Sequence, residues 1–260
     1  MNRPCKELKR MARQNLSGRY GIPMAALLIT GSIPMVAELP FSMLQQNNQP
    51  ISQTVIFYLA DFLISLLAVV LSAGLTQIHL ALARGKDYDL NFVFYGFKNH
   101  PDRFILTGFL LTLMELAALT PLLIGCFAFV EPEKSPAVSQ ILILVLLAAV
   151  SMTLIIFLQL MYAFPLYLIL DDPNLNASQA LHQARILIRG QKGRLFYIYL
   201  SFIGMQLLNL LTLGIGSLWV MPYQQQTLTN FYLELRGELP PYGENFNNSE
   251  QIYAKPNENI

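Results

Sequence analysis

Long apolar stretches alternate along the chain with short basic segments. A helix needs about 20 apolar residues to cross the hydrocarbon core of a bilayer, and the apolar runs reach that length. They lie at residues 22–44, 55–83, 104–130, 138–170 and 195–233. The last run is too long for one crossing, and Gly214 and Gly216 near its middle favour a reversal there. It therefore predicts two crossings, at 195–213 and 215–233, and the pattern as a whole predicts six transmembrane helices.

The basic residues indicate how these helices are oriented. Lysine and arginine precede the first predicted helix, lie between the second and third and between the fourth and fifth, and follow the sixth, whereas only Lys134 lies on the other side. Cytoplasmic segments of membrane proteins carry the excess of Lys and Arg, so we expect both termini to be cytoplasmic in a protein of the cell membrane. Gln224, Gln225 and Gln226 interrupt the last run, which leaves open that 215–233 does not cross and that the tail ends outside.

Two of the basic segments have the periodicity of amphipathic helices. Cys5, Leu8, Ala12 and Leu16 recur at helical spacing near the N-terminus. Residues 177–189 repeat the pattern with Ala177, Ala180, Leu181, Ala184, Leu187 and Ile188 on one face. Asn176 is a suitable N-cap for this second helix and Gly190 a suitable stop.

Helices of this kind lie in the headgroup layer and turn their basic residues toward anionic lipid. The basic residues that we expect to contact headgroups are Lys9, Arg13, Arg185, Arg189, Lys192 and Arg194. The alternative is that both helices pack beneath the transmembrane bundle and only orient the protein.

The fold class that follows is all-α, a polytopic membrane helical bundle with amphipathic cytoplasmic in-plane helices. Basic residues followed by an aromatic precede the first, third and fifth predicted transmembrane helices, which suggests three repeats of an in-plane helix plus a helical hairpin. Residues 1–236 are expected to form one membrane-embedded domain. Residues 237–260 are rich in Asn, Glu and Pro and are expected to form a flexible cytoplasmic tail.

Composition agrees with a membrane location. Of the 260 residues, 54% are hydrophobic and 13% are charged, whereas soluble domains carry roughly 25% charged residues. This composition excludes a soluble domain of ordinary surface and also a disordered chain. The net charge of +1 suggests no nucleic-acid partner, and the lipid bilayer itself is the expected partner. A membrane-protein partner or a second copy of the chain is a further hypothesis.

Three carboxylates lie inside the predicted transmembrane helices without a basic residue at the same depth. They are Glu38, Asp61 and Glu115. A charge at bilayer depth costs roughly 2.5–3.5 kcal/mol on insertion scales, so we expect Glu115, near the middle of its helix, to be neutral and to face the bundle interior. With Gln159 these residues form a candidate intramembrane polar site, linked either to protons or cations or only to structural hydrogen bonding.

No pattern typical of catalysis is present. The sequence has no P-loop and no glycine-rich dinucleotide fingerprint, and its serines lack the spacing of a nucleophile elbow. His79, His100 and His182 have no neighbour that would complete a zinc site. We therefore expect no metal, no cofactor and no enzymatic activity.

The C-terminal half resembles a known family of bacterial membrane proteins. The residues that carry the resemblance are the Leu-Ser-Phe-Ile-Gly segment 200–204, the Gly-Ile-Gly-Ser-Leu-Trp segment 214–219, Pro222-Tyr223, and the Asn-Phe-Tyr-Leu-Glu-Leu segment 230–235. Glu7-Leu8-Lys9, Gly96-Phe97-Lys98, the segment 170–173 and the helix 180–190 extend it over residues 5–236. The chain is similar to the family known as domain of unknown function nine-seven-five, and more distantly to the membrane domain of glycerophosphodiester phosphodiesterases. The resemblance implies a polytopic bacterial membrane protein with no established activity.

Two functions remain as hypotheses. The first is transport of a small solute or lipid, or assistance to such transport, through a cavity that reaches Glu115. The second is a membrane scaffold or envelope-stress protein that acts through its in-plane helices.

Overall fold

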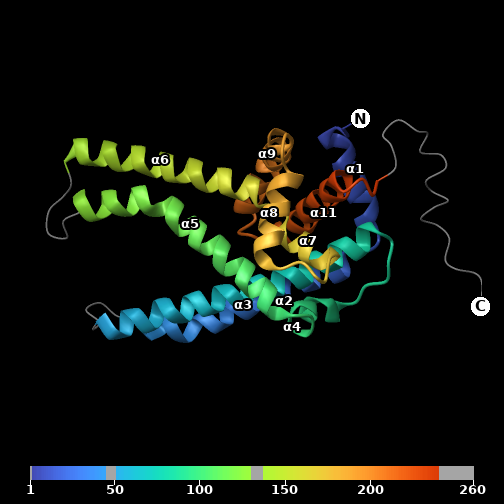
Figure 1. Ribbon diagram of the computed structural model, residues 1–260, viewed down its shortest axis with the longest axis horizontal. Coiled ribbons are helices and arrows are strands. Elements are labelled where there is room, and N and C mark those ends of the chain that lie inside the picture. The colour runs from blue at the N-terminus through green and yellow to red at the C-terminus, as the bar shows by residue number, and fades with distance from the viewer. Residues whose placement is uncertain (1, 45–50, 130–136, 240–260) are drawn as a thin grey trace, which may run out of the picture. The chain divides into compact units, whose positions relative to one another are not determined.

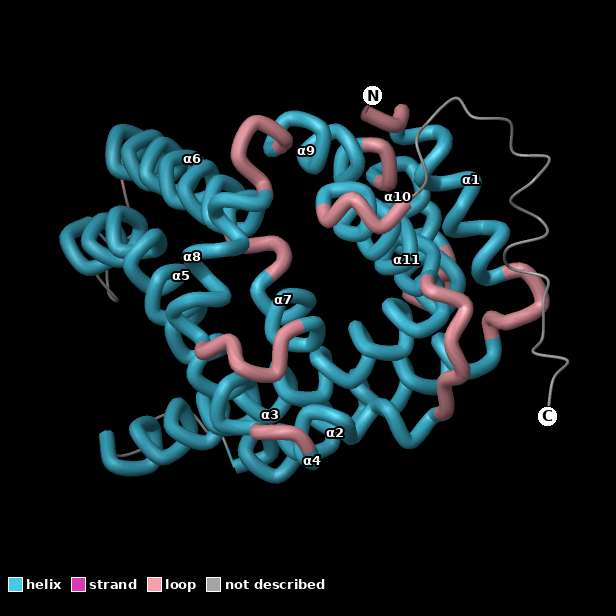
Figure 2. Tube along the Cα trace, turned by 45° about the vertical axis from the view of Figure 1, so that its right-hand side comes forward, coloured by secondary structure: helices cyan, strands magenta, loops and turns pink. Residues whose placement is uncertain are grey.

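The computed structural model describes residues 2–44, 51–129 and 137–239, which are helical and contain no strand (Figure 2). They divide into two compact units. Unit 1 comprises Met1–Asn99 and Phe196–Ile260, and unit 2 comprises His100–Leu195. The helix α9 (Lys192–Leu200) runs across the boundary between these two parts of the chain.

Unit 1 is built on a helical hairpin. Its helices are α1 (Cys5–Leu16), α2 (Gly21–Leu44), α3 (Ile51–Ala83), α4 (Tyr95–Lys98), α10 (Ile203–Leu211) and α11 (Ser217–Leu235), with the 3₁₀ helix η1 (Leu90–Phe94). The long helices α2 and α3 pack along each other, and α11 packs against both of them and against α1 (Figures 1 and 2). Leu8, Ala12 and Leu16 of α1 are fully buried. The predicted amphipathic N-terminal helix is thus confirmed, and α11 covers its apolar face.

Unit 2 contains a second long hairpin. The hairpin consists of α5 (Pro101–Phe129) and α6 (Val138–Met161). The unit also contains the shorter helices α7 (Pro165–Asp171) and α8 (Ala177–Leu187). Pro121 lies inside α5, which changes direction along its length (Figure 1), because proline has no N–H and its ring displaces the preceding turn. The backbone N–H of Leu122, next to the proline, donates to Ser151 Oγ of α6 at 3.3 Å. A side chain of the neighbouring helix thereby satisfies the disturbed backbone, as an apolar environment requires.

The predicted helix at 177–189 is confirmed as α8. The Asn176 side chain accepts from the Gln179 N–H at 2.9 Å, and the Gln179 side chain accepts from the Asn176 N–H at 3.1 Å. This reciprocal pair is a capping box. Gly190 has a φ of +78°, a conformation that glycine adopts without strain and that ends the helix as predicted.

Five segments among the described residues are long and apolar enough to cross a membrane. They are Gly21–Phe41, Ser52–Ala83, Pro101–Phe129, Val138–Asp171 and Lys192–Leu211. These segments match the first five predicted transmembrane helices. The fourth is interrupted where α6 ends at Met161 and α7 begins at Pro165, and the fifth between Leu200 and Ile203.

The sixth predicted crossing, at 215–233, is not among these five segments. It corresponds to α11, in which the polar residues Gln226, Thr227, Thr229 and Asn230 are buried. Both the count of six crossings and the threefold repeat stay predictions.

Part of the predicted tail is ordered against unit 1. Arg84, which follows α3, forms a two-point ion pair with Glu238, with Nε–Oε2 at 2.9 Å and Nη2–Oε1 at 3.0 Å. Residues 237–239 therefore belong to the folded part of the chain. Lys134, predicted on the outer side, and the tail beyond Leu239 lie outside the described residues.

Candidate solute pocket

Unit 1 contains a pocket between α2, α3, α10 and α11. Its volume is about 290 Å³, near the lower end of the range for small-molecule sites. Its apolar lining residues are Leu27, Leu75, Met221 and Pro222, and its polar lining residues are His79, Gln206, Gln224 and Gln225. Among the described residues that line it, none is Asp, Glu, Lys or Arg. The pocket is thus an apolar cavity with convergent neutral polar groups.

The imidazole of His79 is held in one orientation by α11. His79 Nδ1 lies 2.7 Å from Gln226 Oε1, and Gln226 Nε2 donates to the His79 carbonyl at 3.4 Å. This pair of contacts directs the amide oxygen of Gln226 at Nδ1, so Nδ1 carries the proton and Nε2 carries the lone pair. His79 and Gln226 are both fully buried. His79 Nε2 has no hydrogen-bond partner among the described residues.

A chain of hydrogen-bonded amide side chains connects α10 to α11. Asn209 Nδ2 donates to Gln206 Oε1 at 2.8 Å, and Gln206 Nε2 donates to Gln224 Oε1 at 2.9 Å. These two hydrogen bonds determine which end of each amide group is the oxygen and which is the nitrogen. The buried Asn209 Oδ1 has no partner in the described part of the chain, and a side chain at Gly216 would begin 2.6 Å from it. The turn between α10 and α11 therefore packs closely on this amide.

The other polar residues of α11 are satisfied inside unit 1. Thr227 and Thr229 donate to backbone carbonyls one turn earlier, at 2.8 and 2.9 Å. Asn230 accepts from Asn15 of α1 at 3.2 Å and donates to the Leu8 carbonyl at 3.4 Å. A polar helix can lie in an apolar bundle when its groups are paired in this way.

The predicted intramembrane polar site does not coincide with this pocket. Glu38 and Asp61 belong to unit 1, on α2 and α3, and both are exposed. Glu115 and Gln159 belong to unit 2, where Glu115 is half-buried and Gln159 is exposed. Glu115 has no hydrogen-bond or ion-pair partner among the described residues. The role of these four residues stays a prediction.

The predicted headgroup contacts fall into two groups. Lys9, Lys192 and Arg194 contact protein. Lys9 Nζ donates to the Ser201 carbonyl at 2.8 Å and lies 4.0 Å from the centre of the Phe202 ring. Lys192 Nζ lies 4.2 Å from the centre of the Phe157 ring, and Arg194 donates to Gln191 Oε1 at 3.0 Å.

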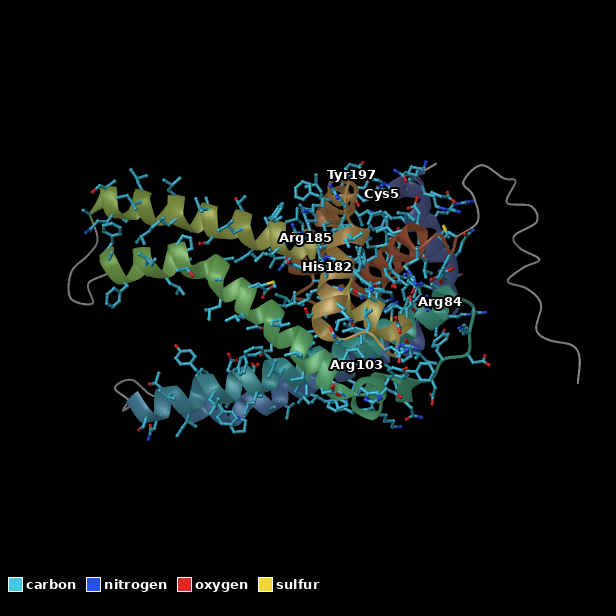
Figure 3. All side chains as sticks on the ribbon, viewed as in Figure 1. Cys5, Arg84, Arg103, His182, Arg185 and Tyr197 are labelled. Atoms are coloured by element: carbon cyan, nitrogen blue, oxygen red, sulfur yellow. The ribbon has the colours of Figure 1, made fainter. Side chains whose placement is uncertain are left out.

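Arg13, Arg185 and Arg189 are exposed, and Figure 3 shows Arg185 on α8 together with His182. Burial lowers the pKa of the Lys9 ammonium, and the neighbouring Cys5 offsets this effect only in part. Lys9 therefore connects α1 to the interruption that separates α9 from α10, whereas the side chains of Arg13, Arg185 and Arg189 are accessible to a ligand.

Sequence reasoning missed the pocket although one signal for it was present. Gln224, Gln225 and Gln226 stood out as a polar interruption of an apolar run, but we interpreted them as a weakness of a transmembrane helix. The partner of Gln226, His79, lies 147 positions away in the sequence, and no local pattern connects the two. Among the described residues, no group of three or more His, Cys, Asp or Glu side chains is placed to hold a metal ion.

The described residues thus form a helical protein with membrane-length apolar helices and a mainly apolar pocket that contains a few neutral polar groups. The family model described as protein of unknown function (DUF975) matches residues 1–238, and the chain belongs to this family. The family resemblance given by the sequence motifs is thereby confirmed. No curated protein and no solved structure matches the chain, and the more distant similarity to the phosphodiesterase membrane domain finds no support.

Proposed function

We propose that the chain is a multi-pass protein of the bacterial cell membrane, with both termini cytoplasmic, that transports a small solute or lipid or assists such transport without catalysing a reaction. The observation that carries the proposal is the pocket of about 290 Å³ with His79, Gln206 and Gln224 in its wall. Polar groups are expensive inside an apolar bundle, and their gathering around a cavity is typical of a substrate site.

The position of the pocket favours access from the cytoplasmic side. His79 lies one turn before the end of α3 at Ala83, and the basic residues Arg84 and Lys86 follow directly. The positive-inside rule assigns this end of α3 to the cytoplasm. A solute that enters there meets the pocket before it meets the long apolar part of the hairpin of α2 and α3.

The six-crossing topology is part of the proposal. With 19 residues and about 1.5 Å of rise per residue, α11 comes close to the roughly 30 Å thickness of the hydrocarbon core. Its polar residues do not oppose this placement because they are paired within unit 1. The exposed apolar residues Leu211, Leu213 and Ile215 around the turn before α11 suit the outer boundary of the bilayer, where this turn lies if both helices cross.

The test is flux through the purified protein in liposomes. Swelling of the vesicles would be followed by light scattering with a panel of small neutral and charged solutes, and exchange of fluorescent lipid between leaflets would be followed in parallel. We expect at least one solute or lipid to move faster than in protein-free vesicles, and Leu75→Phe, which fills the pocket, to reduce that rate. Rates equal to those of protein-free vesicles for the whole panel would contradict transport.

The exposed arginines on α8 and just after it favour a scaffold function as the second candidate. Arg185 lies on α8, whose apolar face is buried, and Arg189 lies two residues beyond its end at Leu187; neither has a partner among the described residues. Such a face suits anionic lipid headgroups or an acidic partner protein. Replacing both arginines with Glu should reduce co-sedimentation with vesicles that contain anionic lipid, and unchanged binding would exclude a headgroup role for α8.

A further inference from the structure

We propose that the pocket of unit 1 binds one acyl chain of a glycerolipid from the cytoplasmic leaflet, and that the amide of Gln224 donates to an ester carbonyl of that lipid. This inference rests on the proposed transport function and specifies the substrate class of the same pocket. The proposed function names two classes, small solutes and lipids, and the lining of the pocket favours the second.

Most polar side chains around the pocket are already occupied by other side chains of unit 1. Gln206 donates to Gln224 Oε1 at 2.9 Å and accepts from Asn209 Nδ2 at 2.8 Å. His79 is fully buried, and its Nδ1 lies 2.7 Å from Gln226 Oε1. A polar solute that leaves water needs a replacement for each hydrogen bond that it loses, and these paired or sealed groups do not provide one. The lining therefore favours an occupant that is mainly hydrocarbon.

Gln224 keeps a donor that is available to an occupant. Its Oε1 accepts from Gln206, whereas no described residue accepts from its NH₂ group, and the side chain is half-buried rather than sealed. An NH₂ group donates and does not accept, so it suits an ester carbonyl. An ester is also uncharged. None of the described lining residues is Asp, Glu, Lys or Arg, and an unpaired charge is costly away from water.

The apolar part of the wall lies next to apolar surface of the same helices. The pocket is partly open, and its lining residue Met221 is 45% exposed. Leu28 and Leu207, which follow the lining residues Leu27 and Gln206 in the sequence, are 54% and 60% exposed. In a membrane, exposed apolar side chains of this kind face lipid tails. An acyl chain can therefore enter the pocket from the bilayer without passing through water.

The depth of the pocket matches that of lipid ester groups. His79 lies one turn before the end of α3 at Ala83, the end that the positive-inside rule assigns to the cytoplasm. Gln224 lies two residues before Gln226, which contacts His79, so its amide belongs to the same level. Ester groups lie at the boundary between the headgroups and the hydrocarbon core. The volume of about 290 Å³ has room for a segment of one chain.

The experiment is native mass spectrometry of the delipidated full chain in detergent, titrated with three probes whose chains have the same length. Diacyl phosphatidylglycerol carries ester carbonyls, its diether analogue has the same headgroup without them, and the free fatty acid is ionised at alkaline pH. We expect saturable binding of the diester and about fivefold weaker binding of the diether, the factor that a lost hydrogen bond predicts. The ionised fatty acid should bind more weakly than the diester.

Equal binding of the diester and the diether would overturn the carbonyl contact. Equal or tighter binding of the ionised fatty acid would overturn the assignment of a neutral ester. Absence of saturable binding of any of the three probes would overturn the acyl-chain site as a whole.

Two variants fill the pocket and one removes the donor. Leu75→Phe and Met221→Trp add bulk to lining residues, the second at a partly exposed position that tolerates it, and both should weaken diester binding about fivefold or more. The matched control Leu28→Phe adds the same bulk to an exposed residue outside the lining and should bind like the unmodified chain. Gln224→Met keeps the length of the side chain and should bind the diester and the diether equally.

The ratio of diester to diether binding is independent of how much folded protein each sample contains. A preference for the diester that persists in Gln224→Met would therefore place the carbonyl contact elsewhere. Diester binding that is unchanged in both Leu75→Phe and Met221→Trp would place the chain outside the pocket. Either result would overturn the inference.

The two proposals can fail separately. Diester binding that both pocket-filling variants lose, with no flux of any solute or lipid in liposomes, would support the acyl-chain site and contradict transport. Flux of a small solute without saturable lipid binding would overturn the acyl-chain site and leave transport standing.

Discussion

Gly74 marks the point on α3 where the backbone of η1 passes directly over the helix. A Cβ atom at this position would lie 2.0 Å from the Val93 carbonyl oxygen and 2.5 Å from that of Phe92. Real carbon and oxygen atoms do not approach so closely, and both neighbours are backbone atoms that cannot rotate away. The glycine therefore permits the docking of the segment that follows α3.

Gly74→Ala should displace η1 from α3 and destabilise the protein by about 1–3 kcal/mol, the usual cost of overpacking. Gly31→Ala is the matched control, because Gly31 lies in α2 with no atom within 4 Å of the new Cβ. Alanine favours a helix over glycine by about 1 kcal/mol, so the control should be neutral or more stable. Thermal unfolding of the purified protein in detergent measures both, and a Gly74→Ala protein as stable as the control would contradict the packing.

Glu115 is the second residue whose chemistry can be tested alone. A neutral carboxyl resembles an amide in size and hydrogen bonding, so Glu115→Gln should leave expression and the unfolding temperature nearly unchanged. Glu115 has no hydrogen-bond partner among the described residues, so Glu115→Leu should change the free energy of unfolding by less than about 1 kcal/mol, the cost of a lost hydrogen bond between membrane helices. Loss of flux in both variants with the fold retained would instead assign Glu115 to proton coupling. Marked destabilisation by Gln would contradict a neutral carboxyl.

At the scale of elements, α8 owes its start to a capping box. Asn176→Ala removes the acceptor for the Gln179 N–H and should cost about 1 kcal/mol. Asn174→Ala is the control, since the Asn174 side chain is exposed and makes no hydrogen bond to a described residue. Asn176→Ala should unfold at a lower temperature than Asn174→Ala at both low and high salt concentration. The lost hydrogen bond joins an uncharged side chain to a nearby backbone N–H, so salt does not screen it. Equal temperatures would contradict the cap.

The helices could be predicted from the sequence because their signals are local. The apolar face of α8 follows from spacing alone, and Leu8, Ala12 and Leu16 are buried as the periodicity indicated. The pocket could not be predicted in this way because it depends on which helices meet. His79 lies on α3 and Gln226 on α11, and nothing local specifies that pairing. The same limit applies to Lys9, whose basic character suggested lipid while its ammonium contacts the Ser201 carbonyl.

At the scale of the whole molecule, charge distribution and helix length together specify topology. An even number of crossings returns the C-terminus to the side of the N-terminus, and both ends carry basic residues. Five segments are apolar enough to cross. The role of α11 therefore decides whether the last hairpin passes through the bilayer or only enters it. The turn between α10 and α11, at residues 212–216, lies outside the cell if both helices cross and inside the bilayer if they only enter it.

Cysteine accessibility should resolve this topology in intact cells. In a background with Cys5→Ser and Cys126→Ser, single cysteines at Ser52, Ala137 and Ile215 should react with an impermeant thiol reagent added outside. Cysteines at Asp87 and Gln191 should react only after the cells are opened, because the basic segments that contain them are cytoplasmic. Ser52, Ala137, Ile215 and Asp87 are exposed and Gln191 is half-buried, so steric shielding by the protein does not account for a difference.

External labelling of Gln191 would overturn the orientation. Labelling of Ser52 and Ala137 without Ile215 would instead show that α10 and α11 enter the membrane from the cytoplasm and return, which contradicts six crossings while both termini stay inside.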